Sequence, residues 1–76
     1  MIKEHDRVVL LSPIASAHLE PGDVGSVVHI YPGHAAYEIE FVALDGTTAA
    51  VETIEASKVR PIRPREMTHA RQLSAA

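Results

Sequence analysis

The sequence predicts an all-β fold class in which five short strands close into one small barrel. Five stretches rich in β-branched and aromatic residues are separated by one long loop, two tight hairpin turns and a single turn before the last stretch, in a chain of 76 residues without cysteine. A chain of this length buries only about 60% of its unfolded surface and has no disulfide to compensate. Closing the sheet removes exposed strand edges and is therefore the favoured arrangement.

The five predicted strands differ in how clearly they alternate. Alternation is strictest in residues 35–44, where three apolar side chains are interleaved with Glu38 and Glu40, so one face is buried and the other is wet. Pro61 marks the last strand as an edge or terminal strand. The predicted ranges are 5–12, 24–31, 35–44, 47–54 and 59–62.

The connections carry turn chemistry. Residues 13–23 predict a long loop with room for one helical turn, which closes with Pro21-Gly22 as the centre of a type II turn. Asp45-Gly46 is the strongest hairpin dipeptide in the chain. Residues 55–58 are too short for an α-helix and fit one 3-10 turn before the last strand. This layout is that of a small SH3-like barrel.

Gly25 lies inside the second predicted strand and indicates a bulge or a close approach of another backbone. A phosphate-binding loop is excluded here, because the sequence has no GxGxxG, no Lys-Ser/Thr and no following helix. With side chains assigned to alternate faces, the predicted core is Val8, Leu10, Val24, Val28, Ile30, Tyr37, Ile39, Phe41, Val51 and Val59.

Charge divides the chain near Ile62. Residues 1–58 hold three basic and nine acidic side chains, a net charge of −6, whereas residues 59–76 hold four arginines against Glu66, a net charge of +3. We therefore predict a barrel over residues 1–62 and a basic tail over residues 63–76. Pro64 and the helical spacing of the apolar residues Met67, Ala70 and Leu73 predict a short helix or a frayed tail.

Few residues offer catalytic or metal chemistry. His29 and His34 flank a Pro-Gly turn with Glu38 nearby, a set that zinc accepts, but no diagnostic spacing such as HExxH occurs. The carboxylates Glu38, Glu40 and Glu52 fit a solvated sheet face better than acid/base catalysis, and no serine has a nucleophile-elbow context. The sequence predicts no enzyme, no metal site and no cofactor.

A protein-interaction role remains, because the strands hold more apolar residues than one barrel interior takes. The expected contact residues are Val9, Leu11, Val27, Tyr31, Met67 and Leu73. The basic patch of the tail is Arg63, Arg65 and Arg71, which could face Glu38 and Glu40 of the acidic body. We expect a non-catalytic module that self-associates as a dimer or larger, or the small partner in a two-protein system of toxin–antitoxin-like or accessory-subunit type.

Nucleic-acid binding and membrane association are both disfavoured by the sequence. The acidic body repels phosphate, so nucleic-acid binding is the weaker alternative. No apolar stretch approaches the roughly 20 residues of a membrane helix, and no signal sequence is evident, so we expect no membrane partner and a cytoplasmic location.

The motifs DRVVL, GDVGSVVHIY, YEIEFVALDG and ASKVRPI, in this order over about residues 5–62, resemble short bacterial proteins of a domain-of-unknown-function family (number 4926). The resemblance implies an SH3-like barrel and no settled activity, and the tail lies outside it. Residues 25–27 are also similar to KOW modules of ribosomal proteins and transcription elongation factors, and to the SH3-like domain of nitrile hydratase β subunits. The KOW likeness implies the nucleic-acid-binding alternative.

Overall fold

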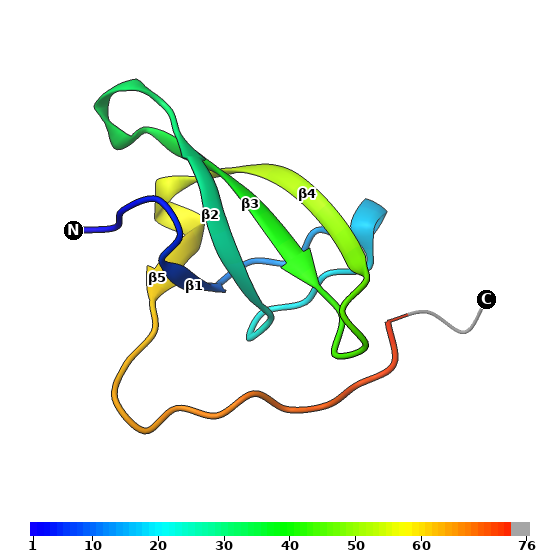
Figure 1. The fold of residues 1–76 in the computed structure, drawn as a ribbon. Coiled ribbons are helices and arrows are strands. Elements are labelled where there is room, and N and C mark those ends of the chain that lie inside the picture. Colours follow the sequence, from blue (N-terminus) through cyan, green and yellow to red (C-terminus); the bar gives the residue numbers. More distant parts are fainter. Residues whose placement is uncertain (74–76) are drawn as a thin grey trace.

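The computed structural model describes residues 1–73, which form one antiparallel five-stranded sheet (Figure 1). The all-β class and the five predicted strands are confirmed. The strands are joined in the order β4-β3-β2-β1-β5, which is compatible with an SH3-like barrel, although no ladder joins β4 to β5 within residues 1–73. Residues 1–61, which contain this sheet, are called the barrel below. The strands are β1 (Arg7–Leu10), β2 (Val24–Ile30), β3 (Ala36–Val42), β4 (Thr48–Glu55) and β5 (Val59–Pro61).

Three 3-10 turns occupy the connections: η1 (Ala15–Ala17), η2 (Pro32–His34) and η3 (Ala56–Lys58). The last of these is the single turn predicted before the final strand. None of the helical segments in residues 1–73 has the length and apolar character needed to cross a membrane.

The predicted turns form as their residue types require. Gly22 has a φ of +98°, and the Asp23 N–H donates to the Glu20 carbonyl at 3.1 Å, which closes a turn with Pro21-Gly22 at its centre. Gly46 has a φ of +91° in the β3–β4 hairpin, where the Asp45 carboxylate accepts from the Thr47 N–H at 3.0 Å.

Gly25 marks a close approach between neighbouring strands. A Cβ at this position would lie 2.5 Å from Cγ2 of Ile39 and 3.0 Å from the Glu40 carbonyl oxygen, so β3 leaves no space for a side chain. Of the two interpretations of this glycine, the close approach is the correct one. The bulge in this strand lies a few residues later.

A β-bulge at Val28 corrects the predicted facing of β2. The β2–β3 pairing shifts register between Val27 and His29, so the inward positions change from odd to even numbers. Val27 is therefore fully buried in the core, whereas Val28, predicted in the core, is 40% exposed. Ile30 is only half-buried, and so is Val24 at the start of the strand.

A second bulge corrects the facing of β4. Val42 pairs with Thr48 but Phe41 pairs with Ala50, so Ala49 is the extra residue. If pairing continued without a shift from Val42 and Thr48, Val51 would lie opposite Ile39 and face the core as predicted, but it lies opposite Glu40 on the outer face and is 47% exposed. Ile54 is buried instead, opposite Tyr37.

The same shift moves Glu52, which was expected on the outer face. It lies opposite the fully buried Ile39, and directly opposed residues of an antiparallel pair share a face. Glu52 is therefore half-buried at the inner side of β4.

The observed core draws on all five strands and on one loop residue, Leu19. Val9 lies outside this cluster but is also buried, because β1 is flanked by β2 and β5, whose Val24 and Arg60 stand beside it in register. The core cluster is Val8, Leu10, Leu19, Val27, Tyr37, Ile39, Phe41, Ile54 and Val59.

Candidate functional site

The tail forms no helix within the described residues. Residues 62–73, called the strap below, leave β5, turn, and run along one end of the sheet towards the β3–β4 hairpin (Figure 1). Arg65, directly after Pro64, has a left-handed φ of +66°, so the helix that Met67, Ala70 and Leu73 suggested does not begin there. Residues 74–76 of the predicted tail lie outside the described residues.

The strap is anchored first at its turn. Arg60 donates to both Glu66 carboxylate oxygens, at 3.0 Å and 2.6 Å, and the Arg63 N–H donates to Oε1 of Glu66 at 2.6 Å. These hydrogen bonds favour the ionised carboxylate, that from Arg60 most, and lower the pKa of Glu66 to about 2. The pair also raises the pKa of Arg60.

The second anchor is prepared by the turn at Glu20–Asp23. Two backbone hydrogen bonds of 2.8 Å tie this turn to β1, one from the Gly22 N–H to the Leu10 carbonyl and one from the Leu10 N–H to the Asp23 carbonyl. The Glu20 N–H also donates to Oδ2 of Asp23 at 2.8 Å. The carboxylate of Asp23 is thus held in place by the barrel before the strap reaches it.

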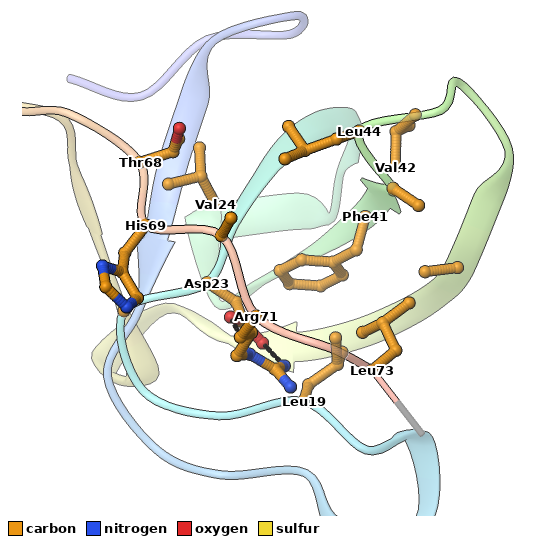
Figure 2. A pocket seen from close by; sticks show the side chains of 14 residues that line it. Leu19, Asp23, Val24, Phe41, Val42, Leu44, Thr68, His69, Arg71 and Leu73 are labelled. Atoms are coloured by element: carbon orange, nitrogen blue, oxygen red, sulfur yellow. Dashed lines mark hydrogen bonds and ion pairs between the residues drawn. The ribbon is translucent and has the colours of Figure 1, made fainter. Parts of the chain in front are cut away.

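Arg71 of the strap binds this carboxylate (Figure 2). Its Nε donates to Oδ1 of Asp23 at 2.9 Å, and its Nη2 donates to Oδ2 of Asp23 and, at 3.0 Å, to the His18 carbonyl. Glu20 adds a weaker ion pair at 3.6 Å. The two forked side chains are 22% and 19% exposed, so the contact is largely shielded from water.

Two opposing effects act on the pKa of Asp23. Burial disfavours the charged carboxylate, but the hydrogen bonds from Arg71 and from the Glu20 N–H, with the charge of Arg71, outweigh it and lower this pKa. The hydrogen bonds that Arg71 donates to Asp23 raise the pKa of Arg71. Asp23 and Arg71 are therefore both charged at neutral pH.

Beside this pair lies a pocket of about 190 Å³ between barrel and strap. Figure 2 shows the Phe41 ring at its centre, with Leu44 on one side and Leu19 and Leu73 on the other. Leu19 and Phe41 form a buried floor, while Leu44 at the rim is 82% exposed. A carboxylate next to an apolar floor suits an extended segment with an arginine and, two residues later, an apolar side chain.

The structure distributes the predicted contact residues over different places. Leu73 and Arg71 lie at the pocket, but Met67 is 92% exposed. Leu11 is exposed, Tyr31 is half-buried, and neither lines this pocket. Val9 and Val27 were expected on an outer surface, and this is wrong because both are buried.

The basic patch is also divided. Arg71 pairs with Asp23 and Glu20, not with Glu38 or Glu40, whereas Arg63 and Arg65 are exposed in the turn. Glu40 instead accepts from the Thr48 hydroxyl at 2.7 Å. Asp23, Leu19 and Phe41 were not predicted as site residues, since Asp23 and Arg71 are 48 positions apart and no local pattern joins them.

The two candidate zinc ligands pack separately against tyrosines. The His29 ring stands edge-on to Tyr31 with centroids 4.7 Å apart, and the His34 ring is similarly placed 6.3 Å from Tyr37. Within residues 1–73, no three His, Asp or Glu side chains are grouped to hold a metal ion.

Comparison with known proteins gives a family but no activity. A family model described as Domain of unknown function (DUF4926) matches residues 4–61, which is most of the chain and ends at the last residue of β5. No curated protein and no solved structure matches the chain significantly. The strands, the Glu20–Asp23 turn and the floor of the pocket lie inside the matched region, and the strap lies outside it. The chain belongs to the family of domains of unknown function DUF4926.

Proposed function

We propose that the chain is a non-catalytic protein-interaction module whose barrel binds an extended segment carrying an arginine followed two residues later by an apolar side chain. The observation that supports this is the seating of the strap itself, with Arg71 forked on Asp23 and Leu73 at the adjoining apolar pocket. The carboxylate supplies a charge-assisted, bidentate contact with directional specificity. The apolar floor supplies burial.

The division of the chain supports separate receptor and ligand roles. The Glu20–Asp23 turn is fixed by its own bonds to β1, so the receptor does not need the strap to take its shape. The strap crosses the barrel with residues 62–70 exposed and is held mainly at its ends. A binding site built in this way accepts the same segment from its own chain or from another.

Self-association is part of this proposal, because a second copy presents the same arginine and leucine. A heterologous partner in a two-protein system would need the same pair of side chains in an extended segment. We further propose a cytoplasmic location for such a module, since a chain without cysteine needs no oxidising compartment.

The nucleic-acid alternative is weaker for an electrostatic reason. Arg60 is paired with Glu66, and Arg71 is paired with Asp23 and Glu20. Each phosphate contact needs a cation that can exchange its counterions. Of the four arginines at the basic end of the chain, two are thus engaged by carboxylates, and Arg63 and Arg65 remain for phosphate.

The test uses the full chain with its own strap released. An Arg71→Asp variant is titrated with a labelled peptide of residues 63–76, and fluorescence anisotropy should report saturable binding. Adding Asp23→Asn to the variant should abolish it, because the fork then lacks its carboxylate. Asp6→Asn, at an exposed aspartate in the N-terminal turn, is the matched control and should leave binding unchanged. Binding that ignores Asp23 would contradict the proposed site.

A further inference from the structure

We propose that two copies of the chain exchange straps, so that Arg71 and Leu73 of each copy seat on the Asp23 pocket of the other. This inference rests on the proposed function, because the exchanged strap uses the same site. The partner is a second copy of the chain, and Arg71 of that copy occupies the site. The resulting dimer is reciprocal and has twofold symmetry.

The turn at residues 63–66 has the properties of a hinge for such an exchange. Arg65 holds a φ of +66°, a region that side chains other than glycine avoid. Pro61 precedes the bend and Pro64 lies within it, and both favour extended backbone in the residues that precede them. A short connection under strain favours exchange, because opening it relieves the strain.

The middle of the strap gives little resistance to opening. Residues 62–70 are exposed, and between the two anchors the side chain of Met67 is 92% exposed. Opening the hinge releases the Arg60–Glu66 pair, whose groups are on the surface and can be solvated by water. The Arg71 and Leu73 contacts are lost only transiently, because the second copy restores them.

The strap is also long enough to reach the pocket of a second copy. The nine residue steps from Ile62 to Arg71 span at most roughly 30 Å when extended. The principal extents of the molecule are 38 × 29 × 21 Å. An opened strap can therefore reach the same site on an adjacent barrel.

The closed and the exchanged form contain the same Arg71 contacts. The equilibrium between the two forms therefore depends on the hinge, on protein concentration and on new contacts between the copies. Leu44 and Met67 supply candidates for the new contacts. Leu44 lines the pocket, Met67 precedes the pocket-lining Thr68, and both side chains are exposed in the closed form. A second barrel brought to this site covers apolar surface that the closed form leaves in water.

Charge reversal separates exchange from closure. Asp23→Arg and Arg71→Asp each place like charges at the site within one chain, so each variant alone should be monomeric by size-exclusion chromatography with light scattering. In an equimolar mixture, the intact strap of the first variant meets the intact Asp23 of the second, and the reversed strap meets the reversed turn. Both attractive pairs form only between chains, so the mixture should give a 1:1 heterodimer.

Two controls keep the outcomes distinct. A single chain carrying both substitutions restores an attractive pair and should fold and associate like the parent, which checks that neither reversal unfolds the barrel. Asp6→Arg alone keeps both Asp23 and Arg71 and should associate like the parent, which checks that a charge reversal outside the site does not disrupt the dimer. A monomeric mixture, with the strap peptide still bound by the Arg71→Asp chain, overturns the exchange and leaves the proposed function standing. A monomeric mixture without peptide binding overturns both.

The hinge provides a second readout. Arg65→Gly removes the unfavourable left-handed side chain from the closed turn of both copies, and we expect it to raise the dissociation constant of the parent dimer by about thirtyfold. Arg65→Ala keeps a Cβ at this position and is the matched control, which should leave the constant unchanged. Equal effects of the two substitutions would overturn the role assigned to the hinge.

Discussion

The barrel and the strap are held in place by different forces. The barrel surrounds nine buried apolar side chains, and no buried side-chain N or O of residues 1–73 lacks a hydrogen-bond partner. The strap is anchored by two arginine–carboxylate forks and a few contacts at a pocket that it leaves partly open. Apolar burial carries the larger share of folding free energy, whereas ion pairs respond to pH and to the removal of single charges. We therefore expect the strap to detach from the barrel under conditions in which the barrel stays folded.

The largest effect should come from the barrel core. Ile39→Ala removes a fully buried side chain that does not line the strap pocket, and we expect it to cost about 2–5 kcal/mol of unfolding free energy. Val51→Ala, on the outer face of β4, should cost less than about 1 kcal/mol. Urea denaturation with a constant m-value measures both. Similar losses in the two variants would contradict the observed facing.

A somewhat smaller effect is expected at the contact between β2 and β3. Gly25→Ala places a methyl group 2.5 Å from Cγ2 of Ile39, so the strands must separate, at a cost of about 1–3 kcal/mol. The neighbouring Ser26→Ala, where a half-buried side chain already has space, serves as the control. A variant as stable as the parent would show that β3 can move away freely.

Weakening the Arg71–Asp23 contact should loosen the strap without unfolding the barrel. Arg71→Lys keeps the charge but loses the planar fork, and we expect faster amide hydrogen exchange over residues 66–73. The strands should retain the exchange rates of the parent, because the core cluster includes no strap residue. Arg63→Lys, in the exposed part of the turn, should change neither segment. Loss of protection in β3 would mean that strap and barrel unfold together.

The smallest effect within the physiological range concerns pH. Asp23 and Glu66 have folded-state pKa values below their ordinary ones, so their contribution is fully present above about pH 4–5 and is lost as the pH falls through the lowered values. The Glu66 anchor should persist to about pH 2, where its carboxylate protonates. Between pH 5 and 8 the strap should stay attached. NMR titration of the Glu66 and Asp23 carboxyl carbons tests this, and a transition between pH 5 and 8 would contradict it.

Local residue chemistry was sufficient to predict the strands. Each strand is bounded by a turn whose residue types require a particular backbone, as Gly22 and Gly46 illustrate. The facing of β2 and β4 was not predictable from alternation, because the extra residues Val28 and Ala49 each reverse the pattern within a strand. Only the pairing with β3 reveals them.

The site was less predictable still, because it joins distant parts of the chain. Arg71 and Leu73 were identified for their charge and apolar character, but their partner Asp23 is 48 positions from Arg71. The spacing of Met67 and Leu73 was interpreted as a helical stripe, although Met67 points into solvent and Leu73 lies at the pocket. The spacing of apolar residues in a sequence does not show which of these residues has a surface to pack against.

The two bulges give β3 a role as the reference against which the rest of the sheet is aligned. Both register shifts occur in strands paired with β3, and each adds one residue to the neighbour. Loss of Ala49 would leave Thr48 next to Ala50, so the ladder would continue without a shift and Val51, Glu52 and Ile54 would keep their present partners and faces. β4 can thus lose one residue at this bulge without turning over, and length variation among related chains at this position would change the local bend of the sheet and not the face that each side chain occupies.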